Sequence, residues 1–209
     1  MSHEPDKLLH SAPVKEFLQA AAGYCIVAET QDQLSRAAFI SSLRHTMAKL
    51  YANMTEIPGI ESLDDAELEK NVSEDDWNAI EQAARKKLGR YNEFQEVFDP
   101  RMTESDTPVV CSLSENIADI YQDIKNFLYL YYIGTEEVMH LALCECQENF
   151  RLYWGQKVAN SLRQLHELEF GQEILEDETE TDTASPPQRD VSKWFLSRRQ
   201  KDYQEEAEE

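Results

Sequence analysis

The stretch SLSENIADIYQDIKNFLYLYYIG, residues 112–134, decides the fold class of this chain. Its apolar side chains recur at intervals of three and four residues, which is the period of one helix face. Ser112 and Glu115 have the spacing of a capping box, and Gly134 follows the last apolar position, where helices commonly end. The stretch therefore predicts an amphipathic helix whose apolar face consists of Ile117, Ile120, Tyr121, Ile124, Phe127, Leu128 and Tyr131.

The same periodicity predicts three helices before this stretch. The first runs over residues 13–30. The second begins at a capping box of Thr30 and Gln33 and ends before Pro58, which breaks helices. The third begins at the cap pair Ser73 and Asp76 and ends at Gly89.

Two shorter predictions complete the pattern. Spaced apolar residues indicate a short extra helix over residues 91–98, followed by a loop over residues 99–112. After the central stretch, Thr135 begins a long helix that runs to about Phe170, and the pattern leaves open whether this helix breaks at Gly155. No segment alternates with the period of two that is typical of a half-buried strand.

We therefore expect an all-α fold, a single antiparallel bundle of about five main helices. Only six glycines in 209 residues agree with helices joined by short connections. We expect residues 1–12 to be a flexible N-terminus and residues 13–171 to form the bundle. Residues 172–189 read as an acidic linker, and residues 190–209 as a basic-aromatic and then acidic tail with a short helix.

The net charge of -21 is unevenly distributed along the chain. Residues 61–76 hold eight acidic residues and one lysine, residues 172–188 hold six acidic residues and no base, and the last five residues include four glutamates. The predicted bundle is thus close to neutral. Direct binding of nucleic acid is not expected, because phosphates require a concentrated basic surface.

Four cysteines are too few for the disulfide framework of a small secreted domain, so we expect reduced thiols at Cys25, Cys111, Cys144 and Cys146. The N-terminal residues lack the apolar stretch of a signal peptide. The longest apolar run, residues 127–133, is too short to cross a bilayer. These observations predict a cytoplasmic protein that does not bind membranes.

Two segments resemble a known family. They are residues 112–123, SLSENIADIYQD, and residues 146–166, CQENFRLYWGQKVANSLRQLH. Together, in this order and spacing, they are similar to a bacterial helical family typical of the Bacteroidetes group, the domain of unknown function 5063. The resemblance covers roughly residues 13–178. It implies an all-α fold and no particular activity, and it transfers no catalytic residue.

Polar residues form a second pattern on two of the predicted helices. Asp119 and Asp123 are four residues apart and share one helix face. The long helix carries a largely uncharged polar stripe at Asn149, Tyr153, Gln156, Asn160, Arg163 and Glu167. We expect an interhelical polar network in which Arg163 or Lys157 pairs with Asp119 or Asp123. The alternative interpretation of the stripe is a groove for a ligand or partner.

The pair Glu137-x-x-His140 has the spacing of one half of a di-metal carboxylate site in a helical bundle. Such sites need a second Glu-x-x-His pair, and none occurs before His45 or His166. Acidic residues at the start of a helix are also favoured by the helix dipole. We therefore expect neither a metal nor a cofactor, and keep Glu137 and His140 only as low-priority metal candidates.

The segment around Trp194, Phe195 and Arg198 combines aromatic and basic residues. It has three interpretations: docking onto the bundle, a recognition motif for a partner, or disorder. Exposed Trp and Arg are enriched at binding hot spots, which is the basis of the second interpretation.

Together these observations favour a non-enzymatic protein-interaction module, an adaptor or regulator. Its partner would be another protein that contacts Tyr153, Gln156, Asn160 and Arg163, or the Trp194 segment. The alternative is a small-molecule or metal-binding helical enzyme that uses Asp119, Asp123, Glu137 and His140. Neither the partner's identity nor the oligomeric state follows from the sequence.

Overall fold

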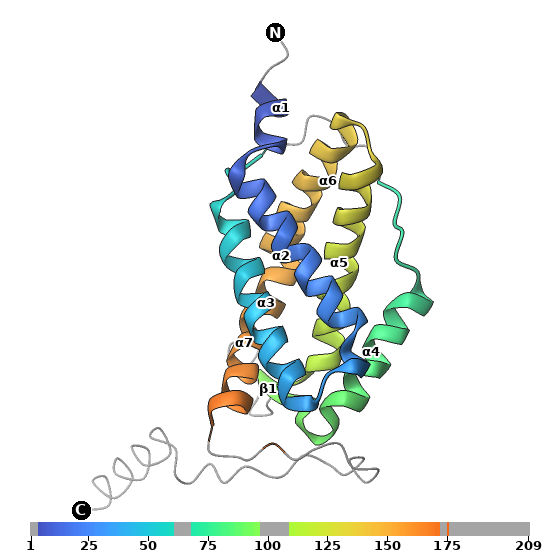
Figure 1. The fold of residues 1–209 in the computed structure, drawn as a ribbon, viewed down its shortest axis with the longest axis vertical. Helices are drawn as coiled ribbons and strands as arrows, with labels where there is room; N and C mark the ends of the chain where they lie inside the picture. The colour runs from blue at the N-terminus through green and yellow to red at the C-terminus, as the bar shows by residue number, and fades with distance from the viewer. Residues whose placement is uncertain (1–3, 61–67, 97–108, 172–174, 176–209) are drawn as a thin grey trace, which may run out of the picture.

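The chain forms a helical bundle, described here from a computed structural model for residues 4–60, 68–96, 109–171 and 175 (Figure 1). The all-α prediction is confirmed, and the five main helices correspond to α2, α3, α4, α5 and the near-continuous pair α6 and α7. The helices are α1 (Glu4–Leu9), α2 (Ala12–Glu29), α3 (Arg36–Glu56), α4 (Glu74–Leu88), α5 (Leu113–Ile133), α6 (Glu136–Asn149) and α7 (Gly155–Phe170).

The apolar faces of these helices meet in one core. Helix α2 packs against α3, α3 against α7, and α5 against α2, α4 and α6. Aromatic rings fill the centre: Phe17 of α2 lies 5.4 Å from Phe127 of α5 and 6.4 Å from Trp154, measured between ring centroids. The periodic residues of the central stretch are buried, as their spacing predicts. The tyrosine Tyr24 fixes α2 on α5 by donating a hydrogen bond to the carbonyl of Ile117 at 2.9 Å.

Most of the predicted helix ends are confirmed. Ser73 and Asp76 form a reciprocal capping box at the start of α4, and Gly89 ends that helix with a positive φ of 55°. Ser112 caps α5 by accepting a hydrogen bond from the backbone N–H of Glu115. The expected Thr30–Gln33 box is wrong, because residues Gln31–Gln33 form a separate 3-10 turn, η1, and Ser35 caps α3 instead.

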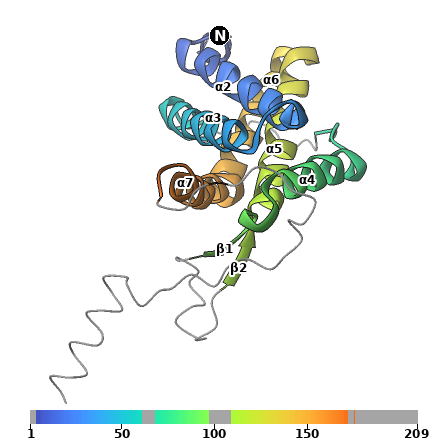
Figure 2. The same ribbon diagram turned by 60° about the horizontal axis from the view of Figure 1, so that its bottom comes forward.

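The short helix and loop expected over residues 91–112 are also corrected. A 3-10 turn, η2 (Gly89–Tyr91), leads into strand β1 (Glu93–Glu96), which pairs antiparallel with β2 (Val109–Ser112), with Phe94 opposite Cys111 (Figure 2). Asn92 stabilises the pair: its side chain donates to Ser112 Oγ and accepts from the backbone N–H of Ser114. These long-range contacts override a local pattern that resembles a helix.

The long helix after Thr135 is interrupted one turn earlier than its glycine suggests. A π-helical turn, η4 (Phe150–Trp154), joins α6 to α7, and Gly155 follows it. The buried Trp154 indole donates to the carbonyl of Cys146 at 3.2 Å, which provides that backbone oxygen with a side-chain partner. A π turn widens the helix and changes the direction of its side chains, so η4 alters which residues of the polar stripe face α5.

The predictions for the segments outside the bundle have different outcomes. Within residues 1–12, for which the sequence predicts flexibility, the structure contains α1, and buried Leu9 at its end accepts a hydrogen bond from Tyr131. The linker and the tail, with Trp194, Phe195 and Arg198, lie outside the described residues. Among the described helices, none has the length and apolar composition required to span a membrane.

Replacing Gly155 with Ala tests the role of the π turn. A Cβ at this position would overlap the Phe150 carbonyl oxygen and lie 2.8 Å from the Phe150 ring, so the turn must shift. We expect Gly155→Ala to lower the free energy of unfolding by about 1–3 kcal/mol, as overpacking does. The measurement is urea denaturation followed by far-UV circular dichroism.

Gly23→Ala in α2 is the matched control, because a Cβ at Gly23 would meet nothing within 4 Å. Alanine is the better helix former, so this change should stabilise the protein by about 0.5–1 kcal/mol. A Gly155→Ala variant as stable as Gly23→Ala would contradict the close packing around η4.

Candidate functional site

Four polar residues of α5 form a line that we call the α5 polar seam: Asn116, Asp119, Asp123 and Asn126. Their spacing of three, four and three residues places them on one helix face. Both asparagines are buried and both aspartates are partly buried. Since buried polar groups require partners, the seam fixes how neighbouring elements pack on α5.

Asp119 is the residue of the seam on which the most elements converge. Its Oδ1 accepts a hydrogen bond from Trp77 Nε1 of α4 at 2.9 Å. Its Oδ2 accepts from the hydroxyl of Tyr153 at 2.9 Å and lies 2.7 Å from Nζ of Lys157. One carboxylate therefore joins α4, η4 and α7 to α5.

Lys157 is held on several sides. Besides Asp119, its Nζ lies 3.4 Å from Asn116 Oδ1 and 4.7 Å from the centroid of the Tyr153 ring. Asn116 in turn donates to Ser161 Oγ at 3.2 Å. Burial alone would lower the pKa of Lys157, but the hydrogen bond and charge of Asp119 outweigh burial and raise it.

The same environment makes Tyr153 a weak acid. Burial, and then the hydrogen bond to Asp119, raise the pKa of its phenol. At neutral pH the lysine is thus charged and the tyrosine neutral. Neither group is prepared to act as a general base or a nucleophile, which would require a lowered pKa.

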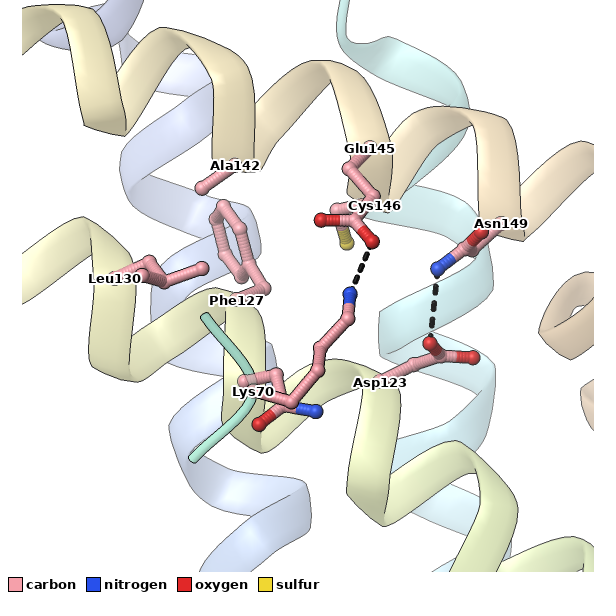
Figure 3. A pocket seen from close by; sticks show the side chains of 9 residues that line it. Lys70, Asp123, Phe127, Leu130, Ala142, Glu145, Cys146 and Asn149 are labelled. Atoms are coloured by element: carbon pink, nitrogen blue, oxygen red, sulfur yellow. Dashed lines mark hydrogen bonds and ion pairs between the residues drawn. The ribbon is translucent and has the colours of Figure 1, made fainter. Parts of the chain in front are cut away.

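Asp123 occupies a different environment one turn further along α5 (Figure 3). Its Oδ1 accepts from Asn149 Nδ2 at 2.9 Å, whereas its Oδ2 is buried and has no hydrogen-bond partner among the described residues. Burial raises the pKa of Asp123 to about 6, although the Asn149 bond and the charge of Lys70 lower it. Figure 3 shows Lys70 directed to Glu145 of α6, with which it forms an ion pair.

The seam ends at Asn126, which fixes the segment leading into α4. Its Oδ1 accepts hydrogen bonds from the backbone N–H groups of Asn71 and Val72, at 2.8 and 2.9 Å. The cavity between this segment, α5 and α6 has a volume of about 10 Å³. That is about the space of one water molecule, which is too little for a larger ligand.

A larger pocket lies at the other end of the seam, between α5, β2 and the start of α7, and we call it the α7 pocket. Its volume is about 200 Å³. Leu152 and Tyr153 are 71% and 45% exposed at its edge, and Gln156 is also exposed. The residues that line it are Cys111, Asn116, Leu152, Tyr153, Gln156, Lys157 and Asn160.

The structure brings some of the sequence candidates together and separates others. Lys157 contacts Asp119, and Tyr153, Gln156 and Asn160 share the α7 pocket. Arg163 is exposed, and within the described part of the chain no ion pair joins it to Asp119 or Asp123.

The metal candidates Glu137 and His140 do not form a metal-binding cluster with other described residues. Glu137 is exposed at the start of α6, where a hydrogen bond with Thr135 lowers the pKa of its carboxyl. His140 is buried, with Nδ1 3.7 Å from Cys144 Sγ. The residues that the structure describes include no group of three or more His, Cys, Asp or Glu that could hold a metal ion.

Several residues of the seam and its contacts were not among the sequence candidates, and Asn116, Asn126 and Trp77 are the most informative of them. Asn116 and Asn126 lie three residues before Asp119 and three residues after Asp123, so extending the aspartate spacing along the helix would have identified them. Trp77 gave no such signal, because only the packing of α4 on α5 brings its indole to Asp119.

Comparison with known proteins identifies relatives but no activity. A family model described as "Domain of unknown function (DUF5063)" matches residues 9–171, in agreement with the two motif segments. The crystal structure of protein BF1032 from Bacteroides fragilis is similar, with a TM-score of 0.70 and 28% sequence identity. The similarity covers 81% of this chain and 99% of that one. No curated protein matches the chain significantly.

Replacing Asp119 tests whether it holds the bundle together. Asp119→Ala removes the acceptor of Trp77, Tyr153 and Lys157, and leaves a partly buried ammonium without its counter-ion. We expect a loss of about 3 kcal/mol in the free energy of unfolding. The measurement is chemical denaturation within a double-mutant cycle with Lys157→Met, in which the loss should be smaller. Strictly additive effects of the two changes would contradict the coupling.

Asp123 predicts a pH dependence of stability. Its folded-state pKa of about 6 lies above the ordinary value of 3.8, so the folded state binds the proton more tightly. The stabilisation is complete below about pH 4 and is lost as the pH rises through 6. We expect Asp123→Asn to remove this dependence and to be more stable than the wild type at pH 7 by roughly 1–3 kcal/mol.

The measurement is denaturation of both proteins between pH 2 and pH 8, a range that covers the titration of Asp123 and of the control residue below. Asp76→Asn is a control of opposite sign, because hydrogen bonds from Ser73 lower the pKa of Asp76. The stabilisation by Asp76 is present above its ordinary pKa and is lost as the pH falls. If the free energies of unfolding of the wild type and of Asp123→Asn change in parallel with pH, Asp123 does not titrate near pH 6.

Proposed function

The chain belongs to the family of the domain of unknown function DUF5063, and we propose that it is a non-enzymatic protein-interaction module that contacts its partner at the α7 pocket. The family description gives no activity, so the proposal is based on the residues of this chain. In this proposal the protein is an adaptor or regulator, the bundle is its scaffold, and the edge of the α7 pocket is its contact surface.

The observation that carries the proposal is the exposure of Leu152 and Tyr153 on the π turn. A π turn within an α-helix is rare and occurs frequently at functional sites. Here it presents an aliphatic and an aromatic side chain beside a hollow, with Gln156 next to them. Tyrosine is enriched among residues that dominate binding energies, and it is most effective next to a pocket.

The chemistry of the pocket supports binding over catalysis. Asp119 and Lys157 neutralise each other, and the pKa of Tyr153 is raised. The volume of about 200 Å³ is also small. Sites for drug-sized ligands measure about 300–1,000 Å³, so one side chain of a partner is a more suitable occupant than a whole small molecule.

The sequence analysis supplies two further candidate contacts, Arg163 and the segment around Trp194. Arg163 is exposed two turns after Gln156 on α7 and extends the surface along this helix. The segment with Trp194, Phe195 and Arg198 has the composition of a binding hot spot and is kept as a second contact surface. It can be separated from the α7 pocket by truncation.

Affinity purification with three baits tests the proposal. The baits are the full chain, the full chain with Leu152→Ser and Gln156→Ala, and a chain that ends at residue 185. We expect the double variant to lose at least one partner that the full chain retains, with recovery reduced about 10-fold or more by quantitative mass spectrometry. Leu152 and Gln156 are exposed, so the fold should survive both changes.

Tyr132→Ser is the matched control, because Tyr132 is 68% exposed at the far end of α5. It should leave the partner list unchanged. If the double variant keeps every partner and only the chain ending at residue 185 loses one, the contact surface is the tail and the proposed role of the α7 pocket is wrong.

A further inference from the structure

We infer that residues 68–72 form a pH-sensitive strap over α5 and α6, which opens as the pH rises and Asp123 becomes charged. The strap is the described end of the connection between α3 and α4. Phe127 and Leu130 of α5 line the cavity beneath it, so opening would uncover apolar side chains. The inference is independent of the proposed function, because it concerns the Asp123 end of the seam and not the α7 pocket.

Few contacts between described residues hold the strap in place. The Oδ1 atom of Asn126 accepts hydrogen bonds from the backbone N–H groups of Asn71 and Val72, and the buried Val72 side chain anchors the end next to α4. Lys70 forms an ion pair with Glu145 of α6, but its side chain is 50% exposed, and exposed ion pairs stabilise a structure little. A segment with so few contacts opens at a lower free energy than the core helices.

Asp123 lies under the strap, in the wall of the cavity of about 10 Å³ that Lys70 also lines (Figure 3). Its Oδ1 accepts a hydrogen bond from Asn149, whereas its Oδ2 is buried and has no partner among the described residues. A protonated carboxyl tolerates this position because it carries no charge. A charged carboxylate requires donors at both oxygens, and burying it without them costs free energy. Ionisation thus favours a state in which water reaches Asp123.

The charges around the cavity do not compensate an ionised Asp123. Among the described residues, the titratable groups that face it are Lys70 of the strap, Glu145 and Cys146 of α6, and Asp119 of α5. The described lining includes no charged residue of α2, α4 or α7. Lys70 is already paired with Glu145, and Asp119 with Lys157. When Asp123 ionises, the Lys70 ammonium therefore faces two carboxylates and can neutralise one of them.

The pKa of Asp123 sets the pH range of the opening. Burial raises this pKa to about 6, although the Asn149 hydrogen bond and the charge of Lys70 lower it. Under an open strap the side chain is hydrated, and its pKa returns toward the ordinary value of 3.8. The closed state therefore binds the proton more tightly. Its stabilisation by that proton is complete below about pH 4 and is lost as the pH rises through 6.

Amide hydrogen exchange of the full chain tests the inference. The exchange rates of the Asn71 and Val72 amides are measured by NMR between pH 4.5 and pH 7.5, and each is compared with the rate of an unstructured chain at the same pH. We expect both amides to exchange faster than the slowest amides of α5 at every pH. Their protection should fall roughly 10-fold or more over this range. In Asp123→Asn, which cannot ionise, it should stay nearly constant.

Two lysine variants are the matched controls. Lys70→Met removes the ion pair of the strap and should lower the protection of both amides about 2- to 5-fold. Lys125→Met removes a similar ion pair, with Glu29, on the opposite side of α5 and should leave their protection unchanged.

Four results would overturn the inference. The first is that the Asn71 and Val72 amides exchange only as slowly as the slowest α5 amides, so that the strap opens only when the whole protein unfolds. The second is that their protection is constant or rises with pH, as it would if Lys70 moved to the charged Asp123. The third is a wild-type pH dependence in Asp123→Asn, and the fourth is an equal effect of the two lysine variants.

Discussion

Asp119 accepts hydrogen bonds or an ion pair from Trp77, Tyr153 and Lys157, which belong to three different elements. A partly buried carboxylate with fewer partners would cost free energy, so the packing of α4, η4 and α7 around α5 is constrained by the need to satisfy this one group. Apolar burial drives the helices together. We infer that the α5 polar seam then favours the arrangement in which these polar groups are all satisfied.

The π turn is the second constraint, and it is linked to the first. An uninterrupted helix through residues 150–154 would advance its side chains by the regular 100° per residue. The π turn alters this progression, so that Trp154 enters the core while its neighbour Tyr153 reaches Asp119. The lack of a side chain at Gly155 permits the close approach of Phe150 that this geometry needs. The π turn thus allows both the burial of Trp154 and the contact of Tyr153 with Asp119.

The two ends of the seam differ in a way that bears on function. Around Asp123 and Asn126 it is closed by the segment before α4 and holds space for one water molecule. At Asn116 it opens into the α7 pocket, where an apolar pair and the Gln156 amide reach solvent. We expect the hydrogen bonds of the covered end to hold the network in place and to support the residues exposed at the other end. Such support is what a binding surface requires.

The amino-acid sequence is sufficient to predict the helices and most of their ends, because helical periodicity and capping residues act over a few positions, as Ser73 with Asp76 shows. It also pointed to Asp119 and Lys157 through their spacing and charge. It did not determine strand β1, whose pairing with residues 109–112 requires distant contacts. Nor could it identify Trp77 as a partner of Asp119 or choose Lys157 over Arg163, because those contacts follow from how whole helices pack. A π turn directs Tyr153 to Asp119 in place of a kink at Gly155, and this depends on long-range packing, because the turn is stabilised by the core around Trp154.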